Sequence, residues 1–261
     1  MDFAIVTPWV YKEEINAFLS NWNISEVPPW LVLQCDENRE GCGVTKNKGV
    51  AEAMRRGADV VVILDGDCYP SAEATTLEQL AELHIAALEP QPVEMFATVT
   101  DPPSRGTPYF ETTIPMPVAA SMGFWRRVGD YCAPRQLTYG ALHPMNFHTA
   151  PIFGRYFPLC GMNLAFRPAK WLPWCSFIDV PRFDDIWMGW LWQRHAYTCG
   201  WCFNLNGPLV THSRQSNVWK NLADEATYLE SNESLWIDIA THESDKYADL
   251  VSLLPIKRGT S

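Results

Sequence analysis

The sequence of 261 residues contains no apolar run of the roughly 18 residues that a membrane-spanning helix needs. Positive charge is also in short supply, because 20 lysines and arginines stand against 30 aspartates and glutamates, a net charge of −10. Broad binding to nucleic acid or to an anionic membrane uses a basic surface, so both are disfavoured. The first residues, MDFAIVTPWV, place an acidic residue where a secretory signal carries basic ones. We therefore expect a soluble, cytoplasmic protein with no membrane partner.

The sequence also lacks the glycine-rich loops of two common nucleotide-binding folds. Neither GxGxxG nor a P-loop pattern occurs, which disfavours Rossmann dinucleotide binding and P-loop chemistry. Eight cysteines are present, and one pair, Cys199-Gly-Trp-Cys202, has redox or zinc spacing. A redox CxxC lies at the start of a helix that follows a strand, and a structural zinc site needs a second pair of ligands. Because this pair leads into a segment with strand character instead, we interpret the cysteines as free interior thiols.

Apolar strands alternate with amphipathic helices along the first hundred residues. The predicted strands are 3–6, 31–33, 60–64 and 94–99, and the predicted helices are 12–22, 45–56 and 73–88. This alternation is typical of a doubly wound α/β fold, with a mixed, mainly parallel sheet flanked by helices. We expect the first strand to end at Thr7-Pro8. We also expect a single domain over 1–225, with a helical extension over 226–261 packed on it.

Two carboxylates follow the most apolar of these strands, in the segment VVVILDGDCYP (60–70). Ligands of open α/β sheets bind beyond the carboxyl ends of the strands, which is where Asp65 and Asp67 fall. Side chains at i and i+2 of an extended segment point the same way, so the pair is suited to a hard cation such as Mg²⁺ or Mn²⁺. The alternative is an Asp-Gly turn that only ends the strand.

A strand-end DxD after two strand–helix units resembles the GT-A glycosyltransferases, whose Rossmann-like fold binds a nucleotide-sugar across the edge of the sheet. The resemblance implies that Asp65 and Asp67 hold a metal on the diphosphate. It places Thr7, Pro8 and Asp36 near the nucleotide base and ribose. It places Lys46 and Lys48 near the phosphates or the sugar, although a solvated helix start is an equal alternative for the lysines.

Four segments of the second half resemble, in this order, the reversibly glycosylated polypeptides of plants, which include the UDP-arabinopyranose mutases. They are ASMGFWRRVGDYCAPRQL (120–137), FPLCGMNLAFRP (157–168), PRFDDIWMGW (181–190) and THSRQSNVWKNL (211–222). The resemblance covers roughly residues 60 to 225 and implies a UDP-sugar as substrate. It also leaves homo- or hetero-oligomers open, since members of this family assemble with one another.

Arg105 lies in RGTPY, which resembles the segment that carries the reversibly glycosylated arginine of the family. A second family arginine, implied to be needed for mutase activity, falls at Thr112. This departure favours a true transferase over a mutase. From the residues alone, Arg105 is either a phosphate-binding arginine or an exposed arginine of a Pro/Ser/Gly loop.

Asp184 and Asp185 precede an apolar stretch, IWMGWLW. One interpretation is a helix N-cap with a favourable charge at the helix dipole. The other is a catalytic base, whose pKa is raised by burial and by a neighbouring like charge. We expect one aspartate to cap and the other, Asp185, to act on the acceptor hydroxyl.

His212 ends the short strand PLVTH. In many GT-A enzymes a late histidine is the third protein ligand of the metal, and imidazole is an acceptable ligand for Mn²⁺. Arg214 and Lys220 follow it and are placed by the same resemblance against the diphosphate. A structural histidine is the alternative.

These observations predict a metal-dependent glycosyltransferase that moves a sugar from a UDP-sugar to an acceptor hydroxyl. The acceptor is left open among a small molecule, a glycan and a hydroxymethylated base of viral DNA. One alternative is a mutase that interconverts the pyranose and furanose forms of a UDP-sugar without an external acceptor. Another is a catalytically silent domain that binds a nucleotide-sugar or a partner protein.

Overall fold

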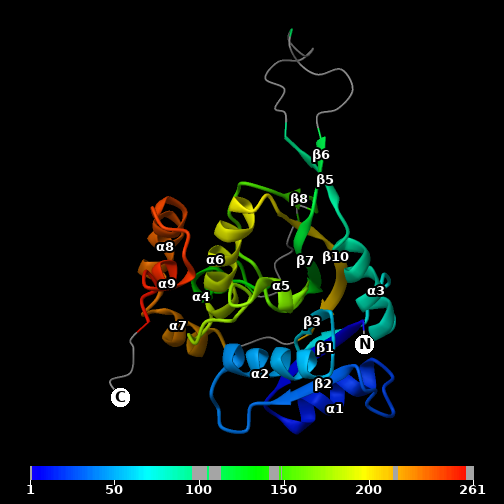
Figure 1. The fold of residues 1–261 in the computed structure, drawn as a ribbon. Coiled ribbons are helices and arrows are strands. Elements are labelled where there is room, and N and C mark those ends of the chain that lie inside the picture. The colour runs from blue at the N-terminus through cyan, green and yellow to red at the C-terminus, as the bar shows by residue number, and fades with distance from the viewer. Residues whose placement is uncertain are drawn as a thin grey trace.

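The computed structural model describes residues 2–95, 105, 113–140, 147, 149–213 and 217–256. Within them the main sheet has eight strands in the order β2-β1-β3-β9-β7-β10-β4, with β8 paired to β10 (Figure 1). The strands are β1 (Phe3–Trp9), β2 (Leu31–Cys35), β3 (Val60–Leu64), β4 (Cys68–Tyr69), β7 (Val118–Arg127), β8 (Pro151–Ile152), β9 (Asn163–Phe166) and β10 (Cys202–His212). The helices are α1 (Lys12–Asn21), α2 (Cys42–Arg55), α3 (Leu77–Ala87), α4 (Ala133–Tyr139), α5 (Pro168–Trp171), α6 (Asp184–Thr198), α7 (Val218–Glu225), α8 (Leu229–Thr241) and α9 (Tyr247–Val251).

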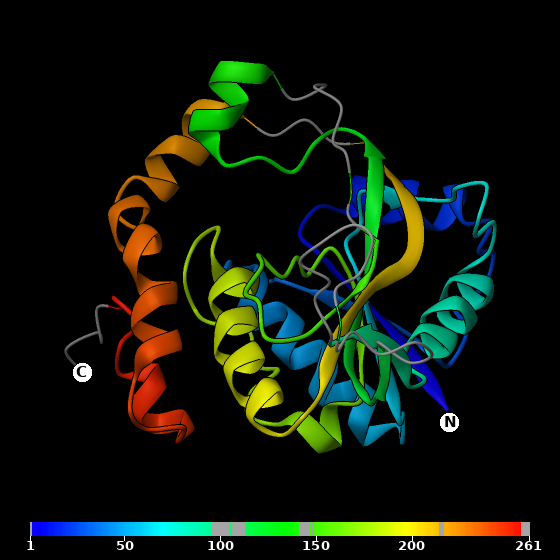
Figure 2. The same ribbon diagram turned by 90° about the horizontal axis from the view of Figure 1, so that it is seen from above.

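The sheet is mixed, as expected, with two parallel parts. β1 pairs in parallel with β2 and β3, and β7 pairs in parallel with β10. Between these two parts β9 runs antiparallel to both β3 and β7. All five residues of β3 are buried, which explains their unbroken apolar run, because helices cover both faces of the sheet. Figure 2 shows α2 and α6 on one side of the sheet and α3 on the other.

The first strand is longer than predicted, because β1 continues through Thr7 and Pro8 to Trp9. Beyond Val6, β1 pairs only with β2, so the edge of β1 on the β3 side forms no backbone hydrogen bonds with a neighbouring strand there. The carbonyl of Trp9 accepts a hydrogen bond from the amide of Asp36, at the β2 side. The polar groups of the preceding residue therefore face the open side, where the missing N–H of Pro8 costs no ladder bond.

Two helix starts differ from the predicted positions. α2 begins at Cys42, three residues before the predicted start, because the carboxylate of Asp36 accepts the amides of Glu40 and Gly41 (2.7 and 3.0 Å) and orders the turn before it. α3 begins at Leu77, four residues after the predicted start. Its N-cap is Thr76, whose hydroxyl accepts the amide of Gln79 at 3.2 Å.

A two-stranded antiparallel arm leaves the main body after α3. It consists of β5 (Gln91–Glu94) and β6 (Thr113–Met116), and it projects away from the sheet in Figure 1. The strand predicted over 94–99 overlaps β5 only at Glu94, and residues 96–99 lie outside the described part of the chain.

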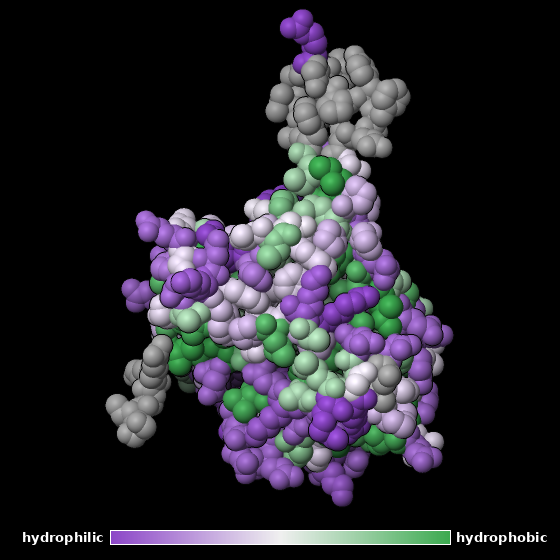
Figure 3. All heavy atoms as spheres, in the orientation of Figure 1, coloured by the Kyte–Doolittle hydropathy of each residue, from purple (hydrophilic) through white to green (hydrophobic). Residues whose placement is uncertain are grey.

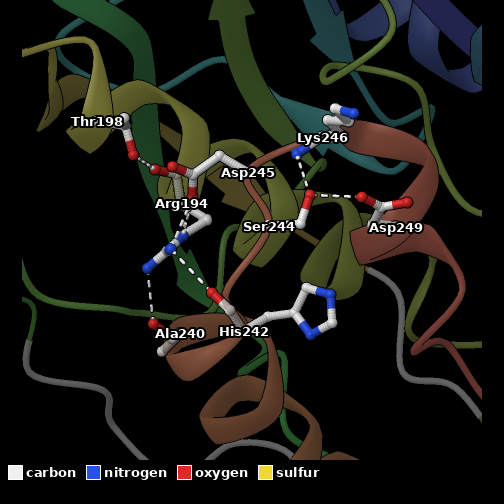
Figure 4. A network of polar contacts seen from close by, with 8 residues as sticks. All are labelled: Arg194, Thr198, Ala240, His242, Ser244, Asp245, Lys246 and Asp249. Carbon is white, nitrogen blue, oxygen red and sulfur yellow. Dashed lines mark hydrogen bonds and ion pairs between the residues drawn. The ribbon is translucent and has the colours of Figure 1, made fainter.

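The C-terminal helices α8 and α9 lie beside α6, with Leu235, Ile239 and Leu250 buried between them. A polar network joins the same elements (Figure 4). In it, Arg194 of α6 donates to the carbonyls of Ala240 and His242 and to the carboxylate of Asp245. These contacts hold the connection between α8 and α9 against α6.

The face in Figure 3 is mostly hydrophilic, with small, scattered hydrophobic patches. Among the described residues, no helix combines the length and the apolar character that crossing a membrane requires.

A buried polar network joins α3 to three strands. Nδ1 of His84 lies 3.0 Å from the hydroxyl of Ser121 on β7, and Nε2 lies 2.8 Å from Oδ1 of Asn163 on β9. Nδ2 of Asn163 donates to the carbonyl of Pro208 on β10 at 2.7 Å. Burial lowers the pKa of His84 to about 4, although the bond with Asn163 opposes the shift. The ring is therefore neutral in the folded protein near pH 7.

Replacing His84 with Gln tests this burial. The unfolded chain protonates His84 below pH 6.5 and the folded chain only near pH 4, so the unfolding free energy of the wild type falls as the pH drops through this window. The loss from this group is about 3 kcal/mol. We expect His84→Gln to remove that part of the pH dependence in urea unfolding between pH 7 and pH 4. His242→Gln is the control, and equal slopes for wild type and His84→Gln would contradict the assignment.

Candidate active site at the carboxyl ends of the strands

Acidic residues surround a cavity of about 270 Å³ at the edge of the sheet where β3, β7 and β10 end. Asp65 and Asp67 follow β3, Asp130 follows β7, and His212 is the last residue of β10. The first turn of α6 also lines the cavity. The described charged residues that line it are Asp65, Asp67, Asp130, Asp184, Asp185, Glu225, Lys46, Arg182 and His212. Among the described residues, six carboxylates therefore share the space with three basic groups.

Lys46 of α2 lies inside this cavity wall rather than at the surface. Its Nζ is 3.1 Å from Oδ1 of Asp65, and its side chain is only 4% exposed. Burial lowers the pKa of Lys46, but the charge of Asp65 and of the carboxylates around it raises the pKa well above its ordinary value. For Asp65, burial raises the pKa and the charge of Lys46 opposes that rise. The ammonium group of Lys46 is therefore charged, beside Asp65 at the end of β3.

Asp67 contacts His212 across the same cavity, with 3.5 Å between Oδ2 and Nε2. Nδ1 of His212 donates to the carbonyl of Val128 at 2.9 Å, which directs Nε2 toward Asp67. Burial lowers the pKa of His212, but the hydrogen bond and charge of Asp67 outweigh burial, and the net pKa is raised. A histidine whose Nδ1 proton is held by a carbonyl presents Nε2 as a metal ligand when it is neutral.

Asp184 and Asp185 form the first turn of α6 and face the cavity. Asp185 accepts the amides of Gly161 and Ile186 at 2.6 and 2.8 Å. Oδ2 of Asp184 is buried and has no hydrogen-bond partner among the described residues. The prediction that an aspartate is the N-cap is wrong, because the N-cap is Phe183, whose side chain makes no capping hydrogen bond. Both carboxylates are turned inward instead.

Burial raises the pKa of Asp185 to about 7, and the negative charge of Asp184 adds to the rise, while Lys46 opposes it. Burial also raises the pKa of Asp184. Near neutral pH, Asp185 is therefore able both to accept and to release a proton, which is the property expected of a general acid–base group.

A glycine allows these groups to come together. A Cβ atom at Gly161 would lie 2.7 Å from Cε1 of Phe177, 3.1 Å from Cβ of Asp185 and 3.3 Å from Nζ of Lys46. Any side chain at Gly161 would therefore push the lysine and the aspartate apart. This close approach accounts for the glycine in CGMNLAF, a segment that carries the family resemblance.

Two further cavities adjoin the first. One, of about 150 Å³, is lined by Pro8, Asp36 and Thr45 and shares Cys42, Asp65 and Asp67 with the first cavity. The other, of about 820 Å³, is lined by Tyr11, Tyr69, Asn217, Lys220 and Asp224, among others, and shares Asp67 and Arg182 with the first. Asp67 thus lies where all three cavities meet.

The remaining predicted residues do not line the first cavity. Thr7 is buried in β1, and Lys48 is on the surface in an ion pair with Glu40. Lys220 is paired with Asp224 at 2.6 Å on the wall of the largest cavity. Arg105 is exposed and lines none of the three cavities, and Arg214 lies outside the described residues.

Three charged residues of the cavity have no role in the sequence prediction: Asp130, Arg182 and Glu225. Arg182 and Asp130 fall inside segments that carry the family resemblance, so their place in those segments was the available signal. Glu225 comes from α7, outside every such segment, and no sequence pattern indicated that it would be 1% exposed.

The described residues contain no cluster of three or more His, Cys, Asp or Glu groups already arranged around a metal position. Asp65, Asp67 and His212 nevertheless provide the donor types that Mn²⁺ accepts, two carboxylates and an imidazole. The surplus of carboxylates in the cavity also favours a bound cation. The residues present therefore fit a divalent metal.

The protein is thus an α/β protein with an acidic cleft at the carboxyl ends of its strands. Three adjoining cavities make up this cleft. The sequence profile of the family described as "Reversibly glycosylated polypeptide" matches residues 54–237. The chain belongs to this family, as the sequence resemblance indicated.

Several plant proteins are similar to this chain. It is 32% identical over 181 residues to "Probable UDP-arabinopyranose mutase 1" of Pisum sativum, and 31% identical over 181 residues to "UDP-arabinopyranose mutase 3" of Arabidopsis thaliana. Each match covers 63% of this chain and 50% of the relative. The chain thus spans about half the length of the curated relatives it matches.

The coupling between Asp184 and Asp185 can be measured directly. Replacing Asp184 with Asn removes the like charge that raises the pKa of Asp185, so we expect that pKa to fall below about 7. Carboxyl ¹³C chemical shifts followed between pH 4 and pH 9 give the value. Asp179→Asn, at an exposed position in the preceding loop, is the matched control. An unchanged pKa of Asp185 in Asp184→Asn would show that burial alone sets it.

Proposed function

We propose that the protein binds a UDP-sugar in this cleft, in the manner of a GT-A fold, and interconverts the pyranose and furanose forms of the sugar. The support is family membership together with relatives that carry the name UDP-arabinopyranose mutase. The observation that carries the proposal is that the Asp184–Asp185 pair lines the same cavity as Asp65 and Asp67. Asp65 and Asp67 then serve the diphosphate, and Asp184 and Asp185 serve the sugar.

The arrangement of the cavities suggests how the nucleotide lies. The smaller cavity, with Pro8 and Asp36, would take the uracil and ribose, and Asp65 and Asp67 would lie beside the diphosphate. Both oxygens of Asp36 accept loop amides, but each keeps a second lone pair for a ribose hydroxyl. The sugar then occupies the first cavity, against α6.

Asp65, Asp67 and His212 would hold Mn²⁺ or Mg²⁺. When bound, such an ion supplies positive charge that neutralises the departing diphosphate. Lys46 supplies a second, permanent positive charge at the same place, since it is buried and paired with Asp65. The acidic wall alone would repel an anionic ligand, so these cations are what make diphosphate binding compatible with the cavity.

The interconversion breaks the bond between the anomeric carbon and the diphosphate oxygen. The anomeric carbon then forms a bond to another sugar hydroxyl oxygen, loses its bond to the original ring oxygen, and re-forms the bond to the diphosphate. In between, the sugar hydroxyl that becomes the ring oxygen loses a proton, and the former ring oxygen gains one. Asp185, with a pKa of about 7, is suited to take the first proton and return it to the second position. The Asp184 carboxylate beside it stabilises positive charge on the anomeric carbon. No step is assigned to exposed Arg105.

Transfer to an acceptor hydroxyl is the second candidate, with Asp185 as the base that deprotonates the acceptor. Two observations favour it. Thr112 stands where the family resemblance expects an arginine, and the cavity of about 820 Å³ beside Asp67 offers room for a second substrate. The two reactions share the site and differ only in which hydroxyl attacks the anomeric carbon.

A panel of UDP-sugars with Mn²⁺ separates the two reactions. Furanose and pyranose forms of the UDP-sugar interconverting without an acceptor would establish the mutase. UDP release only after addition of an acceptor, whether a small sugar, a glycan or hydroxymethylated DNA, would establish the transferase. Binding of UDP-sugar without either outcome would indicate a silent binding domain. Absence of all binding would refute the proposal.

Asp65→Asn and Asp67→Asn are expected to weaken the Mn²⁺-dependent binding of UDP, because each removes a carboxylate from the metal position. We expect each to lower affinity at least tenfold in titration calorimetry with Mn²⁺ and to change little in EDTA. Asp179→Asn serves again as the control. If affinity for UDP is the same with Mn²⁺ and EDTA in the wild type, the protein needs no metal for UDP.

Asp185→Asn is expected to lower kcat about 10²- to 10⁴-fold, the usual contribution of general acid–base catalysis. In the wild type the ionised form must start the reaction, so the rate should rise with pH up to about 7, the pKa of the unliganded site, or up to a lower pH once a bound cation lowers that pKa, and then level off. The variant should lose that rise. A wild-type rate that is independent of pH between 5 and 9 would exclude Asp185 as the base.

A further inference from the structure

Arg182, just before α6, has a backbone that few residues with side chains adopt. Its φ is 69°, in the left-handed region that favours glycine. Such a conformation costs free energy and persists where the surrounding structure needs it, often at a functional site. The role of the Arg182 side chain at this strained position follows from its contacts.

A buried carboxylate fixes one edge of the guanidinium group. Nε of Arg182 donates to Oε1 of Glu225 at 3.1 Å, and the other oxygen of Glu225 accepts the amide of Ala133 at 2.7 Å. Glu225 is 1% exposed, so the surrounding residues hold its side chain in one position. Through it, α7 and the start of α4 set the position of Arg182.

The rest of the guanidinium group is available to a ligand. Arg182 is 30% exposed in its side chain, and its two Nη groups form no hydrogen bond or ion pair with any residue that the structure describes. Arg182 and Asp67 both line the first and the largest cavity. The free edge of the arginine therefore faces the space beside the proposed metal carboxylates.

We propose that Arg182 binds the β-phosphate of the nucleotide diphosphate, with Glu225 as the residue that positions it. The inference rests on the proposed binding of a UDP-sugar. The two Nη groups of an arginine form a planar fork that matches two phosphate oxygens. The arginine carries a delocalised, permanent charge, so it neutralises the phosphate at every pH at which the protein is folded.

The unused donors of Arg182 favour a phosphate over the other parts of a UDP-sugar. Among the described residues that line the cavity, the other basic groups are Lys46, which faces Asp65, and His212, which faces Asp67. Nε of Arg182 is paired with Glu225, and its two Nη groups are the donors left over. A phosphate offers several charged oxygens to both Nη groups, whereas a sugar hydroxyl offers one neutral oxygen.

Titration calorimetry with UDP, UMP and uridine in the presence of Mn²⁺ tests the assignment. For Arg182→Ala we expect about 10- to 100-fold weaker binding of UDP, which corresponds to the loss of a charged hydrogen-bond pair. UMP, which lacks the β-phosphate, should change less than about threefold, and uridine not at all. Arg182→Lys should lie between wild type and Arg182→Ala, because it keeps the charge and loses the fork.

Glu225→Gln should weaken UDP binding less than Arg182→Ala and should also reduce the ratio of UDP to UMP affinity. A merely structural role for Glu225 would lower both affinities together and leave the ratio unchanged. Arg55→Ala, at an exposed arginine of α2 that pairs with Glu52, is the control for lost charge. Thermal unfolding of every variant establishes that it is folded.

The outcomes separate this inference from the function on which it rests. A wild-type protein that does not bind UDP would refute the proposed function itself. A wild type that binds UDP, with Arg182→Ala binding it equally well, would overturn the role of Arg182 alone. Weaker binding of UDP-sugars with unchanged binding of UDP would likewise overturn it, because the arginine would then contact the sugar.

Discussion

The contact between Lys46 and Asp65 is the interaction on which the rest of the cleft depends. It joins the first half of α2 to the end of β3 and places a permanent positive charge where the sheet turns into a loop. Removing either partner would leave the other charge buried and unpaired, which is strongly unfavourable. The pair survives burial because the surrounding carboxylates raise the pKa of the lysine, and because Gly161 leaves space for its ammonium group.

The surplus of carboxylates around this pair makes the charge state of the cleft dependent on what it binds. Burial raises the pKa of Asp65, Asp184 and Asp185, and for Asp185 the value reaches about 7, so near neutral pH part of the unliganded protein keeps a proton there that an isolated carboxylate would release. A cation in the cavity would stabilise the ionised forms and lower those pKa values. Proton release and cation binding would therefore be linked.

The sequence predicted the features that neighbouring residues determine, and it missed those that depend on contacts between segments far apart in the chain. The strand 60–64 and the position of Asp65 and Asp67 followed from a local apolar run and a short motif, and the structure has the strand at these residues. The burial of Lys46 and the contact of Arg182 with Glu225 depend on packing between segments far apart in the chain. No local sequence pattern predicts either of them. The predicted cap on α6 failed for the same reason, since both aspartates face the cavity formed by other elements.

The C-terminal helices pack closely on the rest of the chain. The predicted division falls between residues 225 and 226, directly after a glutamate that lines the first cavity and holds Arg182. Three residues separate α7 from α8, and Asn232 of α8 accepts a hydrogen bond from the ring of Trp187 in α6 at 3.1 Å. The family profile likewise continues to residue 237, inside α8. The segment after residue 225 thus follows directly on the residue that positions Arg182, and it packs on the helix that carries Asp184 and Asp185.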